Sequence, residues 1–254
     1  MLNYPFKETP ESFQANITYE ADIGNHDVRL VTLNSEAIYA QNISGFFSSI
    51  ELVVFISRHS SVSGTPTLSV HTPGNLSSAK LGGIPRKVSI SPANAMRDTL
   101  AEMKRLRDEM HLNYEVSYEC THHGPSLDVP TMFSELGSSP QQWNDLKAAE
   151  TVARATLEGI SKFGSFRAKT VLGIGGTHYQ AKFTRAALER NLAFGHMIPK
   201  HSIATLDLPI LKHCIERTLE KTESAILDWK GIKGEQKTPL IQLLAEANIL
   251  FEKI

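Results

Sequence analysis

Groups able to do acid–base or metal chemistry stand where apolar runs of the sequence end. Four such runs are each followed by a histidine or a lysine among small residues, namely 51–57, 114–120, 170–174 and 225–229. In an open α/β sheet, ligands bind in the crevice beyond the carboxyl ends of the strands. Histidine titrates near neutral pH, and its neutral form binds metal ions. The pattern therefore predicts one polar site built from several strand ends.

The adjacent pair His122 and His123 is the sharpest part of this pattern, and His59 follows another of the runs. Adjacent side chains on an extended chain point to opposite faces. Both imidazoles can therefore serve one site only if the backbone turns, and Gly124-Pro125 supplies such a turn. The alternative is a pair of hydrogen-bonded loop histidines. The other strand-end clusters favour the functional interpretation.

A glycine-rich turn follows the run 170–174 and contains Gly175, Gly176, Thr177 and His178. Glycines let backbone N–H groups approach an anion, which a helix N-terminus also favours. The spacing is neither G-x-G-x-x-G nor a P-loop, because the G-K-[ST] ending is absent. The alternative is a tight packing turn. His178 at the tip of the turn favours a functional role.

Several further side chains are candidates for binding an anionic substrate. Arg58 and Ser60 can donate hydrogen bonds to phosphate or carboxylate. His71 ends another strand and either faces the same crevice or is a turn residue. Lys230 can bind phosphate while the neighbouring Trp229 stacks on a base. The alternative is that Trp229 simply ends a strand. His196 lies inside a predicted strand, where a hydrogen-bonded core histidine is favoured.

The elements that must position these groups alternate in the second half of the chain. Runs of β-branched and alternating residues predict strands at 27–33, 51–57, 65–71, 114–120, 130–136, 169–174, 193–198, 223–229 and 249–253. Caps and apolar periodicity predict helices at 92–110, 139–163, 179–190, 209–219 and 238–247. Alternation predicts a largely parallel sheet flanked by helices, and the strand-rich first half predicts antiparallel edges. The fold class is therefore α/β.

Three of the helix starts rest on specific signals. Ser91-Pro92 is read as a cap residue followed by proline at the first helical position, and Thr238-Pro239 as the start of the last helix. Ser139 and Gln142 form a capping box.

Composition excludes several classes of protein. The 254 residues carry a net charge of −1 and are 41% hydrophobic, so neither disorder nor a general nucleic-acid binder is expected. A local basic patch that grips one end of a nucleic acid remains open. No apolar run approaches the roughly 20 residues that cross a bilayer. With two cysteines and no secretory signal, a soluble cytoplasmic protein is expected.

Taken together, these blocks resemble the D-aminoacyl-tRNA deacylases of the archaeal and plant type. They occur in the order of that family from about residue 27 to the C-terminus, and the combination is specific although each block alone is not. The blocks are SRHSS (57–61), HTPGN (71–75), CTHHGP (120–125), VPTMFSELGSS (129–139), LGIGGTHY (172–179), AFGHMIPK (193–200) and DWKG (228–231).

The resemblance implies one α/β domain over 1–254, of the phosphorylase/peptidyl-tRNA-hydrolase type. It implies hydrolysis of the ester that joins a D-amino acid to the terminal ribose of tRNA, which is chiral proofreading, and it implies zinc. Mapped by motif, His59, His122, His123 and His178 are the candidates for catalysis. The first three of these are also the candidates for binding zinc.

The residues expected to bind the substrate follow from the same mapping. Arg58, Ser60, His71, Lys230 and the turn 175–177 would hold the tRNA 3′ end. The expected partner is that end of the tRNA alone, with no DNA and no membrane, and the protein is expected to be a monomer. Family members begin with a further strand and helix, whereas Met1 here stands almost directly at the segment NYPFKETPES. The absence of that strand is expected to expose a sheet edge or apolar faces.

The residues leave the chemistry open between two mechanisms. Histidine-bound zinc lowers the pKa of its water to about 7 and polarises the carbonyl. Alternatively a histidine acts as general base, with backbone N–H groups of the turn 174–178 stabilising the oxyanion. Two rival functions also remain. One is a nucleoside phosphorylase-like or metal-dependent hydrolase of small molecules, and the other is a catalytically silent module that binds the tRNA end.

Overall fold

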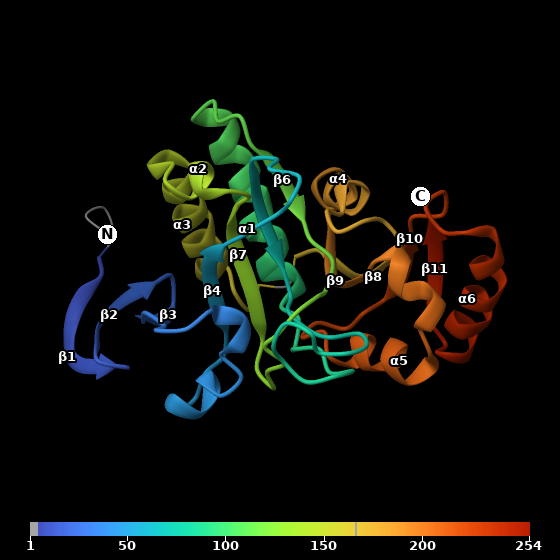
Figure 1. Ribbon diagram of the computed structural model, residues 1–254, viewed down its shortest axis with the longest axis horizontal. Helices are drawn as coiled ribbons and strands as arrows, with labels where there is room; N and C mark the ends of the chain where they lie inside the picture. The colour runs from blue at the N-terminus through green and yellow to red at the C-terminus, as the bar shows by residue number, and fades with distance from the viewer. Residues whose placement is uncertain (1–4, 166) are drawn as a thin grey trace.

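A small antiparallel sheet lies at one end of the molecule in a computed structural model that describes residues 5–165 and 167–254 (Figure 1). Its strands pair in chain order and are β1 (Lys7–Phe13), β2 (Asn16–Ile23) and β3 (His26–Leu30). Two 3₁₀ turns then lead to the central sheet, η1 (Ala37–Tyr39) and η2 (Ile43–Phe46). The sequence predicts only the third strand. β1 is mostly exposed and polar, and it carries no apolar alternation. β2 alternates Ile17, Tyr19, Ala21 and Ile23 with polar residues, a strand signal that the prediction missed.

The central sheet has the strand order β4-β7-β5-β6. Its strands are β4 (Val53–Arg58), β5 (Thr67–His71), β6 (Glu115–Tyr118) and β7 (Thr131–Gly137). β4 runs parallel to β7, and β5 runs parallel to β6, but β5 and β7 are antiparallel. The prediction of antiparallel strands at the edges is therefore wrong for this sheet. Every residue of β7 is buried, and a strand with both faces buried belongs in the interior of a sheet.

The second half of the chain forms a parallel sheet with the order β11-β10-β8-β9, as its alternating pattern predicts. Its strands are β8 (Lys169–Ile174), β9 (Leu192–Ile198), β10 (Ser224–Leu227) and β11 (Leu250–Lys253). Ile174 lies opposite both Leu227 and Ile198 in the register. The carboxyl ends of these strands therefore line up along one edge.

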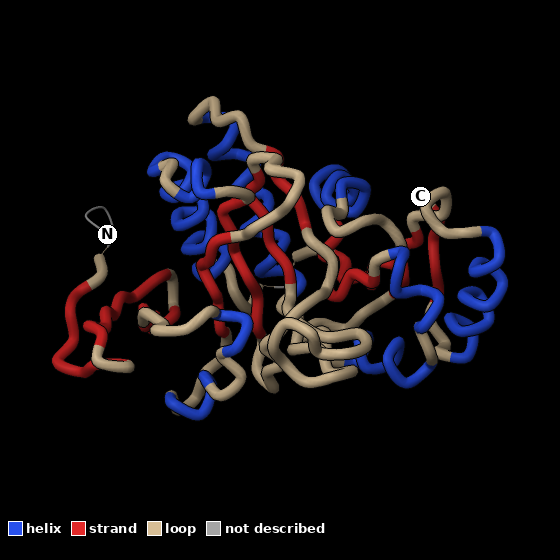
Figure 2. The backbone as a smooth tube through the Cα atoms, viewed as in Figure 1, coloured by secondary structure: helices blue, strands red, loops and turns tan. Residues whose placement is uncertain are grey.

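Helices cover these two sheets, and long loops over 72–92 and 119–130 gather at the lower centre of the view (Figure 2). The helices are α1 (Ala93–Glu109), α2 (Pro140–Trp143), α3 (Leu146–Ser161), α4 (Ala181–Arg190), α5 (Leu208–Glu216) and α6 (Gly234–Glu246), with a 3₁₀ segment η3 (Lys200–Thr205). The α-helices match the predicted segments to within a few residues at most ends. None of them is both long and apolar enough to traverse a bilayer.

Three predicted helix boundaries are wrong. The predicted helix 139–163 is two helices, because the Asp145 carboxylate accepts hydrogen bonds from two backbone N–H groups and starts a new helix. The last helix begins at Gly234, and Pro239 lies inside it. Ser91 does not cap α1. The N–H groups of Ala93 and Asn94 instead donate to the Glu220 carboxylate at 3.0 and 2.9 Å, a contact that no local pattern shows.

One hydrophobic core joins the two larger sheets. Leu68 from β5, Tyr118 from β6, Phe194 from β9 and Ile226 from β10 belong to the same cluster of buried side chains. Because apolar burial drives folding and is shared across both sheets, they pack as one unit. The strand ends of both sheets are held in a fixed relation for that reason.

The packing of α1 against α3 depends on Gly159. A methyl group at this position would stand 2.0 Å from the Thr99 hydroxyl oxygen. We expect Gly159→Ala to lower the free energy of unfolding by about 1–3 kcal/mol, as overpacking does. Thr99→Ala/Gly159→Ala should recover most of the loss, because it removes the clashing hydroxyl. Urea unfolding measures both changes, and no recovery in the double variant would contradict this account.

Candidate active site

Five histidines from four strand ends converge on one place. The ring centroids of His122 and His123 are 4.2 Å apart, and those of His71 and His122 are 4.5 Å apart. His178 lies 4.6 Å from His122 and 5.3 Å from His59. The structure thus brings together the four predicted catalytic histidines and adds His71 to them.

The backbone turns at the histidine pair, as the sequence predicts. His123 has a left-handed φ of 41°, which brings both imidazoles to the same cluster. The His122 Nδ1 lies 2.7 Å from the Cys120 carbonyl oxygen, and the His123 Nδ1 lies 2.7 Å from that of Gly124. Carbonyl oxygens only accept hydrogen bonds, so both Nδ1 atoms donate. The Nε2 atoms of both rings are therefore left with lone pairs.

Two buried glutamates complete the cluster, and sequence reasoning missed both. The Glu119 side chain is 0% exposed, with Oε1 accepting from the Ser69 hydroxyl at 2.5 Å. Its Oε2 lies 2.9 Å from the His178 Nε2. Glu135 is 3% exposed, and its Oε2 lies 3.2 Å from the His59 Nδ1. Both carboxylates therefore touch imidazoles directly.

A signal for these glutamates was present in the sequence. Each is a carboxylate inside an otherwise strand-like run, Glu119 in YEVSYEC (114–120) and Glu135 in TMFSELG (131–137). A carboxylate that must be buried needs a charged or hydrogen-bonding partner. A buried glutamate in a strand that ends near histidines is therefore itself a site prediction.

One half of the cluster, made of His59, His178 and Glu119, favours charged groups. Burial lowers the pKa of His59, but the carboxylates of Glu135 and Glu119 outweigh that effect and raise it above its ordinary value. The pKa of His178 is raised in the same way, with Glu119 opposing burial. Burial raises the pKa of Glu119, but His178, His59 and His122 together lower it below its usual range. This half therefore favours the protonated form of both imidazoles beside the Glu119 carboxylate.

The other half, made of His71, His122 and His123, favours neutral imidazoles. Burial, followed by the neighbouring imidazoles, lowers the pKa of His71 well below its ordinary value. Burial and then His123 lower the pKa of His122 to about 3. Burial also lowers the pKa of His123. Neutral imidazole is the form that coordinates transition metals.

Three buried polar atoms of this cluster have no hydrogen-bond partner among the described residues, namely His59 Nε2, His71 Nδ1 and Glu119 Oε2. The His178 Nε2 is close to the last of these, but its orientation does not make a hydrogen bond. Such atoms are costly to bury unless something satisfies them. Their concentration at one place points to a bound ion or water as part of the working site.

The donor atoms form groups compact enough to hold a metal ion. Within the described ranges, one group is His71, His122 and His123, whose donors lie within 4.8 Å of one another. Three other groups are equally compact. They are His59, Glu119 and His178; Cys120, His122 and His178; and His71, Glu119 and Glu135. His59 therefore joins a different group from His122 and His123, although the family resemblance implies all three as zinc ligands.

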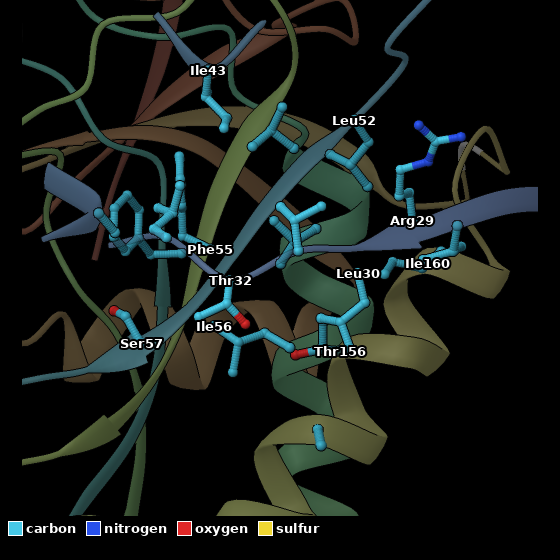
Figure 3. Close-up of a pocket in the computed structure, with 18 of the residues that line it drawn as sticks. Arg29, Leu30, Thr32, Ile43, Leu52, Phe55, Ile56, Ser57, Thr156 and Ile160 are labelled. Atoms are coloured by element: carbon cyan, nitrogen blue, oxygen red, sulfur yellow. The ribbon is translucent and has the colours of Figure 1, made fainter. Parts of the chain in front are cut away.

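A groove of about 2870 Å³ runs from the histidines towards the N-terminal sheet. Its histidine end is lined by His59, His122, His123, Glu135 and His178. Figure 3 shows the other part of the groove, where apolar side chains of β3, β4 and α3 point inwards, among them Leu30, Ile56 and Ile160. A few polar side chains lie beside them. β4 forms one edge of its sheet, and β7 is its one neighbour among the described strands. The site is therefore reached through an open, partly apolar groove.

The predicted substrate-binding residues fall into separate places. Arg58 and Ser60 line the groove, and the Arg58 guanidinium lies 5.0 Å from the centre of the Trp143 ring. His71 is fully buried behind the other histidines, so it does not reach the groove surface. Lys230 is exposed at the carboxyl edge of the parallel sheet.

The glycine turn of residues 175–178 serves packing in part. The Gly175 N–H donates to the Ile198 carbonyl oxygen at 2.8 Å, so it is not free to bind an anion. Both glycines have positive φ angles, and a Cβ at Gly176 would stand 2.2 Å from the Gln180 side chain. The turn places His178 in the cluster, and its exposed Thr177 remains available to a ligand.

His196 is a core histidine, as expected. Its Nδ1 lies 3.1 Å from the Thr121 hydroxyl, and its Nε2 lies 3.1 Å from the Arg217 carbonyl oxygen. Complete burial lowers its pKa to about 3. Between that value and the ordinary 6.5, the unfolded chain binds a proton that the folded chain refuses, so His196 makes stability fall as pH falls.

The His196→Gln variant tests this pH dependence. Glutamine does not titrate, so the variant lacks this effect of His196. The slope of its free energy of unfolding against pH should be flatter by up to about 1.4 kcal/mol per pH unit below pH 6.5. Urea unfolding of both proteins between pH 4 and 8 gives the two slopes. Identical slopes would show that His196 is protonated in the folded protein.

Comparison with known proteins assigns the chain to a family. A family model described as D-aminoacyl-tRNA deacylase matches residues 46–252. The chain belongs to the D-aminoacyl-tRNA deacylase family. A member from Thermococcus kodakarensis is 39% identical over 92% of this chain and 86% of its own length, and one from Pyrococcus abyssi is 38% identical over 99% and 92%.

A solved structure shares the fold of this chain. It is titled as a conserved protein of unknown function, has a TM-score of 0.88 and 27% sequence identity, and covers 100% of this chain and 88% of its own. The deacylase-family resemblance and the α/β fold class that the sequence predicts are thereby confirmed. The five histidines and two glutamates described above all lie within the stretch that the deacylase family model matches.

Proposed function

We propose that this chain hydrolyses the ester bond of D-aminoacyl-tRNA and releases the free D-amino acid and tRNA. The observation that carries the proposal is a buried histidine–glutamate cluster opening into a groove, in a chain of the D-aminoacyl-tRNA deacylase family. Ester hydrolysis needs groups that move protons and groups that stabilise a developing oxyanion. The cluster offers both kinds of group in one place.

Proton transfer is assigned to the charged half of the cluster. The His178 side chain is 40% exposed, so it can meet both the substrate and water, while Glu119 beneath it is 0% exposed. The carboxylate raises the pKa of the imidazole and so favours its protonated form. His59 stands in the same relation to Glu135. We assign to these two histidines donation of a proton to the departing ribose oxygen.

The neutral half of the cluster suits a metal ion. The Nδ1–H groups of His122 and His123 are tied to backbone carbonyls, which fixes their rings and leaves Nε2 as the ligand atom. Burial lowers the pKa of His71, which favours its neutral form, and its Nε2 lies 3.2 Å from the His123 Nε2. Zinc bound by these three imidazoles would polarise the ester carbonyl and supply an activated water. The donor set therefore fits zinc.

The tRNA 3′ end is assigned to the surface around the cluster. Arg58 and Ser60 line the groove on one side, and Thr177 is exposed on the other. We place Lys230 with these residues as a phosphate contact. A tRNA substrate implies a cytoplasmic location. A monomer is proposed because the cluster draws every side chain from one chain.

The direct test compares D-tyrosyl-tRNA with L-tyrosyl-tRNA as substrates of the purified protein. We expect release of D-tyrosine and no comparable release of L-tyrosine. Release of a base from nucleosides, or hydrolysis of a small amide, without action on either tRNA would favour the small-molecule hydrolase. Binding of tRNA with no ester cleavage would show a silent binding module.

The metal assignment has a test that does not depend on activity. We expect about one zinc ion per chain in the purified protein by elemental analysis, with a lower content in His122→Ala. His111→Asn, which changes an exposed histidine at the end of α1, should keep the zinc of the wild type. Equal zinc contents in the two variants would exclude His122 as a ligand.

A further inference from the structure

The carboxyl edge of the parallel sheet carries a row of lysines. Lys253 ends β11, Lys230 follows β10, and Lys200 follows β9. The register places Leu227 opposite both Lys253 and Ile174, so these lysines stand along one edge. The C-terminus lies beside β10 and β11 at the same edge (Figure 1). Three of the four strands thus contribute an ammonium group there.

The charges of these lysines are not neutralised by neighbouring carboxylates within the described ranges. Among the residues that the structure describes, none of Lys200, Lys230 and Lys253 forms an ion pair. Lys182 nearby is paired with the buried Asp228 carboxylate, so that acidic group is already neutralised. Lys253 lies 3.8 Å from the centre of the Trp229 ring, which orients its ammonium group. An unneutralised row of this kind attracts a polyanion.

The dimensions of the row fit a nucleic-acid strand. Neighbouring strands lie about 4.8 Å apart, so four strands place the outer lysines roughly 14 Å from each other. The axial rise per phosphate is about 3.4 Å in one strand of a duplex, so the row matches about four nucleotides. The whole chain carries a net charge of −1. The basic character is therefore local rather than general.

The row begins beside the catalytic cluster. The Lys200 N–H donates to the Gly176 carbonyl oxygen at 3.0 Å. Gly176 belongs to the turn that ends at His178, which contacts Glu119. A strand whose last nucleotide reaches His178 can therefore continue directly over Lys200 and Lys230.

We propose that this row binds the phosphate backbone of the tRNA acceptor end, upstream of the nucleotide that carries the amino acid. The inference rests on the proposed function and adds to it Lys200 and Lys253, together with a direction for the acceptor strand along the edge of the sheet. Phosphate contacts of this kind position a nucleic acid without reading its sequence. The row supplies affinity for any tRNA, whichever amino acid it carries.

The test compares Lys200→Gln/Lys230→Gln with a control, Lys169→Gln/Lys221→Gln, which removes two exposed lysines at the opposite edge of the sheet. Lys169 begins β8 and lies 3.9 Å from Glu223, and Lys221 precedes β10. We expect kcat/KM for D-tyrosyl-tRNA to fall about tenfold in the first variant and to stay at the wild-type value in the control. The slope of log kcat/KM against log salt should become shallower by about 1.4–1.8, as loss of two phosphate contacts predicts.

Two results would overturn the proposal. One is an equal loss on D-tyrosyl-adenosine, which has the ester but no phosphate backbone. The other is an unchanged salt slope in the row variant. If the wild type fails to hydrolyse D-tyrosyl-tRNA, the proposed function fails, and binding of uncharged tRNA then tests the row alone. In that case, equal affinity of the wild type and the row variant at every salt concentration would reject the row.

Discussion

Glu119→Gln should lower kcat/KM for D-tyrosyl-tRNA by about 10²–10⁴-fold, the range spanned by general acid–base catalysis. The amide keeps the shape of the side chain but removes the charge that raises the pKa of His178 and His59. Both histidines would then lose their protons at a lower pH, and the proton donor of the reaction would be missing at neutral pH. The pH profile of the remaining activity should move to lower pH accordingly.

The matched control for this prediction is Glu115→Gln, which changes an exposed glutamate at the start of β6, the strand that Glu119 directly follows. We expect wild-type activity from it. Urea unfolding of both variants shows whether Glu119→Gln remains folded. A folded Glu119→Gln protein with wild-type kcat/KM and an unshifted pH profile would remove the carboxylate from the mechanism.

His122→Ala and His123→Ala should each abolish most deacylation while the protein stays folded. Their rings lie 4.2 Å apart in the cluster, and each Nε2 carries a lone pair for a metal ion or a reacting proton. Loss of a zinc ligand removes the metal, and loss of a catalytic base removes proton transfer, so both mechanisms predict a decrease of at least about 10²-fold. Steady-state release of D-tyrosine from D-tyrosyl-tRNA measures the effect.

The backbone at His123 needs a separate control. Its φ of 41° is unfavourable for alanine, whereas asparagine tolerates the left-handed region. His123→Asn therefore removes the imidazole with less strain, and it should be as inactive as His123→Ala. If it instead regains wild-type turnover, the loss in His123→Ala comes from the backbone and not from the imidazole.

The sequence predicts those parts of the fold whose signals are local. The alternation of strand and helix after residue 169 predicts a parallel sheet, and strand ends predict where His59, His122 and His178 meet. His59 reaches the cluster although β4 runs opposite to β5 and β6, so strand direction does not explain its place. The parallel sheet is predicted correctly because the alternation of strand and helix is a local pattern. The turn at Gly124-Pro125 succeeds for the same reason, since a turn is encoded by adjacent residues.

The predictions that fail depend on contacts between distant residues. The start of α1 is set by Glu220, which is more than a hundred residues away, so Ser91 gives a misleading cap signal. The place of β7 between β4 and β5 depends on which strand is most buried in the finished fold. Glu119 and Glu135 look like solvated strand residues until the histidines that neutralise them are known to be near. The prediction that this sequence lacks the first strand and helix of other family members stays a prediction.

The most direct test of the central claim is a single-turnover assay with enzyme in excess over D-tyrosyl-tRNA. The claim is that this chain hydrolyses the D-aminoacyl ester at the histidine–glutamate cluster. Wild-type protein should release D-tyrosine in one exponential phase, and the Glu119→Gln/His122→Ala variant should leave the ester intact over the same time. Equal single-turnover rates for the wild type and a folded double variant would contradict the claim.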